Sequence, residues 1–389
     1  MIKDLYYSST ILLAILLLVF ALLFLCMHIC RCNEIPNYRT ASKLMAVAYL
    51  IFGCANFMEF IGKHTAKEAD EALLFCLATL IVATSQAFLF TYSLILLINT
   101  SYVTPRRIVK ELIPIIAFSV TAAVGMFILP EMFVKIFVYV FTLFYIRQLV
   151  QYTRLFVTLY RRRRRELENF YSGPEPKRLE WIIVSFFTAL GVGISALVVS
   201  LFPHIHIYVS LLCQCIYISV YIYFAIRFFN YAFIFRDIEQ TFIKNKNDSE
   251  IKDRVLPIST ALHLEQKIGQ WIGDKGFLKN NLTLNDLARQ LGTNNKYLSI
   301  YINKEKHMTF RDWINSLRIQ EAKTLLLENT DLSIKDISFD VGFSSHAYFG
   351  KLFLENTGFT PQTWRARNQA KMTTLSLFFL LSSTTIYFL

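Results

Sequence analysis

Charged side chains are scarce in this sequence. Asp, Glu, Lys and Arg together make up 17% of the 389 residues, whereas 54% are hydrophobic and 15% are aromatic. An ordinary water-soluble domain carries about 25% charged residues. The deficit excludes a soluble globular protein as a description of the whole chain. It indicates a membrane protein with a smaller soluble part.

Cysteine is absent from the C-terminal part, because all seven cysteines lie at or before Cys215. No disulfide framework therefore holds that part together, which fits a reducing cytosol. Cys26, Cys30 and Cys32 form a cluster with His28. Cys26 and Cys30 would lie one helical turn apart while His28 points elsewhere, so we interpret the cluster as small membrane residues and expect no metal site.

Common catalytic motifs are also missing. The sequence contains no zinc-binding His-Glu-x-x-His, no Gly-x-Ser-x-Gly nucleophile turn, no glycine-rich phosphate loop and no pair of intramembrane aspartates. Hydrolase, protease and kinase chemistry would therefore have no nucleophile or metal set. We expect a protein that is not an enzyme and that uses no cofactor.

Seven apolar runs are long enough to cross a hydrocarbon core of roughly 30 Å, which takes about 20 residues. They predict an all-α protein in which residues 1–235 form a seven-helix transmembrane bundle. The runs lie near residues 11–29, 44–61, 72–98, 112–129, 133–150, 181–202 and 207–229.

Basic residues follow the first, third and fifth runs. Five consecutive arginines, Arg161 to Arg165, follow the fifth, where we expect contact with anionic membrane lipids. On the other side, residues 130–132 and 203–206 contain no Lys or Arg, and the remaining connection holds Lys63 and Lys67 among three acids. The positive-inside rule then places the N-terminus outside and the C-terminal domain in the cytoplasm.

Four polar residues inside the runs are candidates for sensing a signal: Asn56, Glu59, Gln86 and Gln214. Such groups are costly in lipid and tend to face a bundle interior. Hydrogen bonding between helices is the alternative explanation. The outer connections are too short to fold into a sensing domain, so we expect the stimulus to be a small or lipid-borne ligand or another membrane protein.

The polar residues 236–256 show no apolar period and predict a linker, followed by a soluble domain over residues 257–370. The final residues, 371–389, approach the length of a membrane span, although seven Ser and Thr dilute the apolar stretch from Met372 to Leu389. An eighth span and an apolar tail lying on the membrane or on the protein are both open alternatives.

One helix-turn-helix pattern occurs twice in the soluble domain, over residues 282–303 and 332–353. In each copy, two apolar pairs at four-residue spacing form a stripe on one helix face. Gly292 and Gly342 lie between the stripes, where a sharp turn favours positive φ. The matched pairs are Leu287 and Leu291 with Ile337 and Val341, and Leu298 and Ile302 with Phe349 and Phe353.

Helix starts in this domain are marked by a hydroxyl residue followed three positions later by an acid, which is the spacing of a capping box. This pattern occurs at Thr283, Thr309 and Ser333, and Thr360 before Pro361 marks a fourth start. Residues 309–327 predict one helix about 28 Å long. That length suits two recognition helices in successive major grooves about 34 Å apart, so one monomer would read two half-sites.

Residues 259–367 resemble the DNA-binding domain of the arabinose-regulator (AraC/XylS-type) transcription factors. The resemblance is carried by LNDLARQLG, INSLRIQEAKTLLLE and, most specifically, IKDISFDVGFSSHAYFGKLFLENTGFTPQTWR. It implies sequence-specific binding to double-stranded promoter DNA, and activation more than repression. RNA polymerase and a second copy of the chain are the further partners that it suggests.

The resemblance also implies which residues face DNA. Ile300 and Gly350 depart from the polar residues often found at their positions, which weakens direct readout of bases, since Ile300 offers a thymine methyl contact and no bidentate hydrogen bond. His307 stands where relatives usually carry glycine, so it must tolerate a helix-ending conformation. The implied base-facing residues are Lys296, Ser299, Ile300, His346, Ala347, Gly350 and Lys351, and the implied phosphate contacts are Asn294, Asn295, Arg318 and Lys351.

Together these patterns favour a membrane-embedded one-component transcription regulator, in which the bundle senses a stimulus and controls a cytoplasmic DNA reader. The alternative is a multi-pass receptor or transporter whose helix-turn-helix domain serves protein–protein signalling. A transporter predicts solute flux that survives deletion of residues 257–370, whereas a regulator predicts lost transcriptional control without flux.

Overall fold

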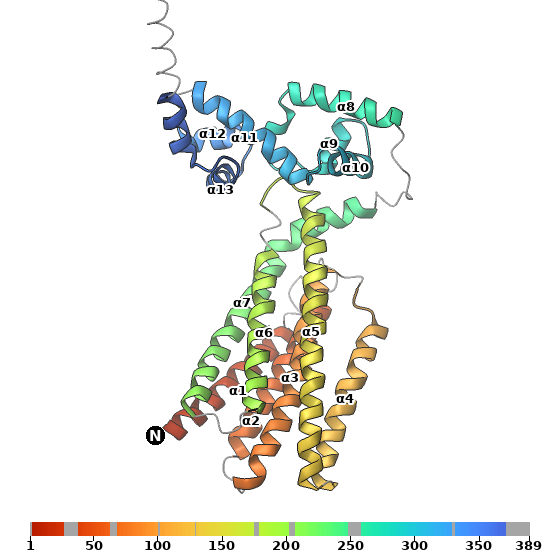
Figure 1. Ribbon diagram of the computed structural model, residues 1–389, viewed down its shortest axis with the longest axis vertical. Coiled ribbons are helices and arrows are strands. Elements are labelled where there is room, and N and C mark those ends of the chain that lie inside the picture. The colour runs from red at the N-terminus through yellow and green to blue at the C-terminus, as the bar shows by residue number, and fades with distance from the viewer. Residues whose placement is uncertain are drawn as a thin grey trace, which may run out of the picture. The chain divides into compact units, whose positions relative to one another are not determined.

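The computed structural model describes residues 2–26, 38–62, 68–99, 102–128, 130–174, 179–201, 207–247, 258–328 and 331–370. All regular elements in these ranges are helices, and the one β-bridge found there pairs Tyr171 with Thr283. The chain forms two compact units, one of residues 1–163 and 179–242 and the other of residues 164–178 and 243–389. The prediction of an all-α fold is confirmed (Figure 1).

The first unit is a bundle of long helices (Figure 1). Seven helices among the described residues are long and apolar enough to cross a membrane, and each coincides with a predicted run. They are α1 (Ile2–Cys26), α2 (Tyr38–Gly62), α3 (Glu68–Ile98), α4 (Pro105–Ile128), α5 (Glu131–Glu168), α6 (Glu180–Leu201) and α7 (Ile207–Asn247).

Buried tyrosines tie the helices of the bundle together. The Tyr49 hydroxyl on α2 donates to the carbonyl of Tyr221 on α7 at 2.7 Å, and the Tyr38 hydroxyl donates to Phe228 at 3.0 Å. Each of these rings fills apolar space while its hydroxyl donates to a backbone carbonyl, so these two hydroxyls are not buried without an acceptor. The bundle is therefore held by specific contacts as well as by apolar packing.

Two helices run further than the apolar runs alone predict. Helix α5 continues beyond the end of its apolar run at Val150, through the five arginines to Glu168. Helix α7 continues to Asn247, so the prediction of a linker beginning at Arg236 is wrong for residues 236–247. This segment contains neither Gly nor Pro, and polarity alone does not end a helix. The rest of the predicted linker, residues 248–256, lies outside the described residues, as do the tail 371–389 and three residues of the cysteine cluster, His28, Cys30 and Cys32.

The second unit contains the doubled helix-turn-helix pattern. Its helices are α8 (Ile258–Gly273), η4 (Gly276–Leu278), α9 (Leu284–Gln290), α10 (Asn295–Glu305), α11 (Phe310–Glu328), α12 (Ile334–Asp340), α13 (His346–Thr357) and a last helix over residues 361–370. Within this unit α11 lies between the group α8–α10 and the pair α12–α13 (Figure 1). The long helix predicted for residues 309–327 is confirmed to within one residue.

The predicted helix starts are confirmed. Thr283 accepts a hydrogen bond from the backbone N–H of Asp286, and the Asp286 carboxylate accepts one from the backbone N–H of Thr283. Backbone N–H groups also donate to the side chains of Thr309, at 3.2 Å, and of Ser333, at 3.0 Å. These caps satisfy N–H groups that have no partner within the helix. The short helices α9 and α12 are thereby fixed at their first turns.

Both apolar stripes form the cores of their helix pairs. The eight matched residues of the doubled pattern are all 5% exposed or less. Around the second pair, Ile337, Val341, Phe349 and Phe353 join Phe343 and one face of α11 in a single buried cluster. The pairing predicted from spacing alone is therefore the packing that forms.

The turns between the paired helices require positive φ, as predicted. Gly292 has φ of 63° and Gly342 has φ of 89°. A Cβ at Gly342 would lie 2.4 Å from the carbonyl oxygen of Leu278, whereas a Cβ at Gly292 would meet nothing nearer than Lys267 Nζ at 3.5 Å. His307 adopts φ of 52°, the left-handed conformation expected where it replaces glycine.

Candidate nucleic-acid interface

The first recognition helix, α10, starts at an asparagine cap. The Asn294 side chain accepts a hydrogen bond from the N–H of Tyr297 at 2.8 Å and is otherwise exposed. Leu298, Tyr301 and Ile302 face the core, and burial raises the pKa of the Tyr301 hydroxyl above its usual range. The opposite side of α10 faces outward. The backbone N–H groups at the helix N-terminus favour a negatively charged ligand.

The outward side of α10 carries the residues that the resemblance assigned to DNA. Lys296, Ser299 and Ile300 are each partly exposed. The Ser299 hydroxyl accepts a hydrogen bond from Nδ2 of Asn303, one turn further along, at 3.2 Å. Asn303 and Lys304 are exposed beyond them and add polar groups at the end of this surface. The face is thus formed by one cation, several short polar groups and one branched apolar side chain.

The second recognition helix, α13, presents a different surface. His346, Ala347 and Lys351 are exposed, and Lys351 Nζ lies 3.7 Å from the Glu355 carboxylate one turn away. A Cβ at Gly350 would meet nothing within 4 Å. Since Ala347 and Gly350 are both small, this helix leaves room for close approach of a bulky partner such as a base edge or a phosphate chain. Lys351 is the cation on that side.

Asn295 and Arg318, two of the implied phosphate contacts, make hydrogen bonds within the domain. Arg318 is only 2% exposed, and its guanidinium donates to the carbonyl oxygens of Phe277 at 2.8 Å and Lys279 at 2.6 Å. The phosphate contact expected for Arg318 is incompatible with this burial, so we assign it to fixing η4 against α11. Asn295 donates to Asn285 Oδ1 at 3.3 Å and its own Oδ1 is buried, so it links α9 to α10.

A segment from outside the C-terminal sequence packs on the first helix-turn-helix. The residues that follow the α5 helix belong to the same compact unit as α8–α13. Leu284 N–H donates to Phe170 O at 2.9 Å, and Ser172 donates to Leu282 O through its N–H at 3.2 Å and through its hydroxyl at 2.6 Å. These bonds enclose Thr283, the cap of α9, in a short antiparallel pairing with Tyr171.

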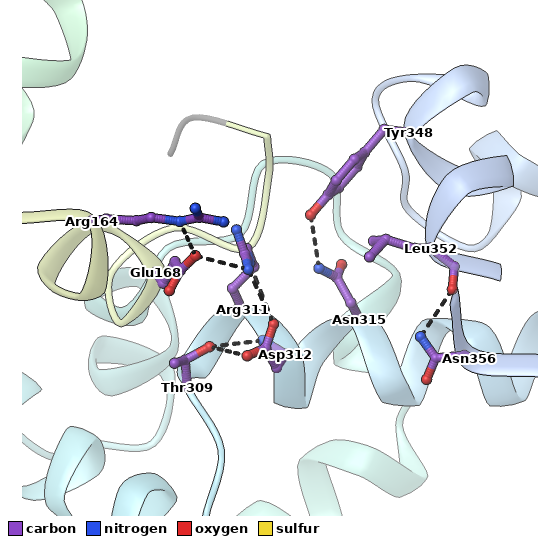
Figure 2. A network of polar contacts seen from close by, with 9 residues as sticks. All are labelled: Arg164, Glu168, Thr309, Arg311, Asp312, Asn315, Tyr348, Leu352 and Asn356. Carbon is purple, nitrogen blue, oxygen red and sulfur yellow. Dashed lines mark hydrogen bonds and ion pairs between the residues drawn. The ribbon is translucent and has the colours of Figure 1, made fainter. Parts of the chain in front are cut away.

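An ion pair reinforces this docking (Figure 2). Arg311, at the start of α11, contacts the Glu168 carboxylate at 3.0 Å, and the two side chains are 15% and 12% exposed. Glu168 also accepts from Arg164 Nε at 3.0 Å, and Arg311 lies 3.3 Å from Asp312. Because the pair is largely removed from water, it is screened less than a surface pair.

The face of α11 that carries Arg311 also contacts α13, the second recognition helix. Asn315 follows Arg311 by one turn and donates to the Tyr348 hydroxyl on α13 at 3.3 Å (Figure 2). Both Asn315 and Tyr348 are buried. Residues four apart share one helix face. One face of α11 therefore touches both the last residue of α5 and the helix that carries His346 and Lys351.

Sequence reasoning missed the segment 168–172 and its partner Arg311. Its signal was the pair Phe170 and Tyr171, two aromatic residues in a connection otherwise rich in charge. Both are buried. Large apolar groups in a short hydrophilic connection indicate that the connection packs on something. The partner lies more than 110 residues away in sequence, so spacing could not identify it.

Comparison with known proteins places this domain among bacterial regulators. A family model described as a helix-turn-helix domain matches residues 287–367. The melibiose operon regulatory protein of Escherichia coli is 30% identical over 120 residues, and the Msm operon regulatory protein of Streptococcus mutans is 33% identical over 90 residues. The transcriptional activator RhaR of Escherichia coli is 30% identical over 119 residues. These are the relatives that the resemblance predicted.

The similarity is confined to the C-terminal part. The alignments cover 30%, 23% and 31% of this chain, and 38%, 32% and 41% of the three relatives. The C-terminal domain of AraT, a response regulator from Geobacillus stearothermophilus, aligns with 29% of this chain at 28% identity and a TM-score of 0.25. The seven long apolar helices lie outside the residues that the family model matches.

Proposed function

The C-terminal part of this chain is an AraC-type helix-turn-helix domain, and from that premise we propose that the protein is a membrane-embedded one-component transcription regulator. The observation that carries the proposal is the presence, in one chain, of this domain and of seven helices long enough to span a bilayer. The reader binds promoter DNA through α10 and α13, and the bundle controls it in response to a stimulus.

The surface of the bundle supports embedding in lipid. Large apolar side chains lie exposed on its helices, among them Leu22 at 61%, Leu143 at 66% and Leu212 at 62%. A water-soluble protein rarely exposes contiguous apolar surface of this kind. In a bilayer these side chains face lipid tails, and the bundle needs no further partner to cover them.

The orientation follows from charge. The connections after the first, third and fifth spans hold most of the Lys and Arg, which favours the cytoplasm for these connections and for the C-terminal domain. The N-terminus then lies outside, and the reader reaches the chromosome in the cytoplasm of a bacterial cell. The exposed Arg161 and Arg162 suit anionic lipid headgroups at the inner surface.

Helix α5 is the proposed route by which the bundle controls the reader. It is one continuous helix, and the boundary between the two compact units falls within it, after Arg163. Its last turn carries Glu168, which holds Arg311, and the residues after it hold the cap of α9. A shift or rotation of α5 would therefore act on α9 and α11, the elements that position both recognition helices.

The competing function is protein–protein signalling by the same domain. It predicts that the outward faces of α10 and α13 contact a protein and that chromosomal DNA is not bound. The partly exposed Lys296, the exposed Lys304 and Lys351 and the uncrowded Gly350 favour DNA. RNA polymerase and a second copy of the chain are further partners that fit a regulator.

Chromatin immunoprecipitation of the tagged full-length protein tests the proposal. We expect a small number of sharp peaks at promoters. Lys351→Ala should lower their occupancy, whereas Glu355→Ala should retain or increase it, because it breaks the same ion pair but leaves the cation. The absence of promoter peaks for the wild-type protein, or equal loss in the two variants, would reject DNA reading through α13.

A further inference from the structure

The transmembrane bundle contains a partly open cavity of about 920 Å³. Six of its seven helices contribute to the lining, and α4 does not. This volume lies within the range of roughly 300–1,000 Å³ found for small-molecule sites. The four polar residues selected from sequence as signal-sensing candidates, Asn56, Glu59, Gln86 and Gln214, all line it.

Two of these residues are already engaged with neighbouring helical groups. Gln214 donates to Thr10 at 2.6 Å and accepts a hydrogen bond from Ser9, so it joins α7 to α1. Asn56 donates to the carbonyl of Phe52 in its own helix at 2.8 Å. The Gln214 contacts match the alternative of hydrogen bonding between helices, whereas the Asn56 bond lies within α2.

Glu59 and Gln86 offer acceptors to the cavity. The Glu59 carboxylate accepts one hydrogen bond from the Tyr6 hydroxyl at 2.6 Å, and a carboxylate can accept about four. Gln86 donates through Nε2 to the carbonyl of Ala48 at 2.5 Å, which fixes the orientation of the amide. Its Oε1 is buried and has no hydrogen-bond partner among the described residues.

The charge of the lining selects a class of ligand. Among the described residues that line the cavity there is one carboxylate, Glu59, and no Lys, Arg or His. Much of the remaining surface is aromatic, including Tyr6, Phe52, Tyr145 and Tyr217. A buried acceptor without a donor is costly, and aromatic faces attract cations. A ligand with N–H donors and a positive charge on an apolar body would satisfy the buried acceptor and also be attracted to the aromatic faces.

We propose that this cavity binds a small protonated amine with an aromatic or alkyl body, whose ammonium group donates to Gln86 Oε1, while the Glu59 carboxylate on the same lining supplies the compensating negative charge. An anionic ligand would meet a carboxylate with no compensating cation, and a purely apolar ligand would leave Gln86 Oε1 without a donor. The role of this ligand as the stimulus rests on the proposed function. Binding itself does not.

The test measures binding to the full-length protein in lipid nanodiscs, without DNA, by calorimetry. The probes are phenethylamine, tryptamine and hexylamine, with 2-phenylethanol as the neutral analogue and 3-phenylpropionate as the anionic one. We expect at least one amine to bind at least tenfold more tightly than both analogues. If no amine binds, or if an analogue binds as tightly as the best amine, the proposal is wrong.

Variants assign the site. Glu59→Gln and Gln86→Leu should each weaken amine binding at least tenfold, while Glu180→Gln, at an exposed carboxylate that does not line the cavity, should leave it unchanged. An unchanged thermal unfolding midpoint shows that a variant has folded. Amine binding that survives both cavity variants with wild-type strength would overturn the assignment. Because no DNA is present, such a failure is separate from a failure of the transcriptional proposal.

Discussion

At the scale of single residues, the two turn glycines of the doubled motif have the same conformation but different surroundings. Gly292 and Gly342 both adopt positive φ, yet only Gly342 lies against a backbone carbonyl, that of Leu278. Positive φ alone costs an alanine about 1–2 kcal/mol. At Gly342 the overlap with backbone adds to that cost, since the backbone cannot move aside as a flexible side chain can.

We therefore expect Gly342→Ala to destabilise the reader much more than Gly292→Ala. Three of the four tryptophans, Trp271, Trp313 and Trp364, lie in this domain, so thermal unfolding followed by tryptophan fluorescence reports on it. The Gly292 variant should lose about 1–2 kcal/mol, and the Gly342 variant should lose more or fail to fold. Equal losses at the two sites would contradict the packing described for Gly342.

Arg318 illustrates how a basic residue can be structural in a DNA-binding domain. Arg318→Leu leaves the buried carbonyls of Phe277 and Lys279 without their donor, at a cost of about 1–3 kcal/mol for an unsatisfied group. We expect a clearly lower unfolding midpoint by tryptophan fluorescence. A variant with the wild-type midpoint but lost promoter occupancy would instead support the phosphate contact inferred from sequence.

At the scale of elements, the contact between the end of α5 and the start of α11 is the proposed point of control. Glu168 and Arg311 form an ion pair that is mostly removed from water. Breaking one partner leaves the other charge poorly solvated. The segment also pairs with the backbone around Thr283, so the ion pair is one of several bonds.

We expect Glu168→Arg and Arg311→Glu each to change transcription of a target promoter at least several-fold, because like charges then face each other. The double variant, which restores opposite charges, should recover much of the wild-type response. Reporter transcription together with immunoblotting measures this, since blotting separates regulation from protein level. Additive effects in the double variant would show that the pair does not transmit control.

Local rules account for most of the elements that sequence predicted. The caps at Thr283 and Ser333 and the apolar pairs such as Leu298 with Ile302 depend on residues at most four positions apart, so their spacing is visible in the chain. Arg318 was misjudged because its partners, Phe277 and Lys279, are about 40 positions away. The docking of Phe170 and Ser172 was not predicted for the same reason. Helix α7 extends beyond its predicted end because polar residues without Gly or Pro continue a helix.

The candidate sites show the same division. Composition and spacing identified Glu59 and Gln86 one by one as polar groups within apolar runs. Their placement around one cavity, and the difference between them and the engaged Gln214, depend on how α1, α2, α3 and α7 pack. Residue type therefore predicted which side chains were candidates. Only the packing distinguishes Gln86, whose acceptor is open to a ligand, from Gln214, which bonds between helices.

At the scale of the whole molecule, the proposed regulator combines in one chain a helical bundle suited to lipid and a helix-turn-helix domain suited to DNA. The two suit each other only if the DNA-binding domain lies in the cytoplasm, the location that we propose from the distribution of Lys and Arg. Regulation then requires no separate signalling partner. Regulation by a membrane-embedded protein does require that target promoters come close to the inner membrane surface.

The location of the reader tests this account most directly. Green fluorescent protein, which becomes fluorescent in the cytoplasm, and alkaline phosphatase, which is active outside it, are each fused after Ala370. We predict bright fluorescence and inactive phosphatase at equal expression. Active phosphatase together with a dark fluorescent fusion would place the helix-turn-helix domain outside the cell, away from any promoter, and would contradict the account.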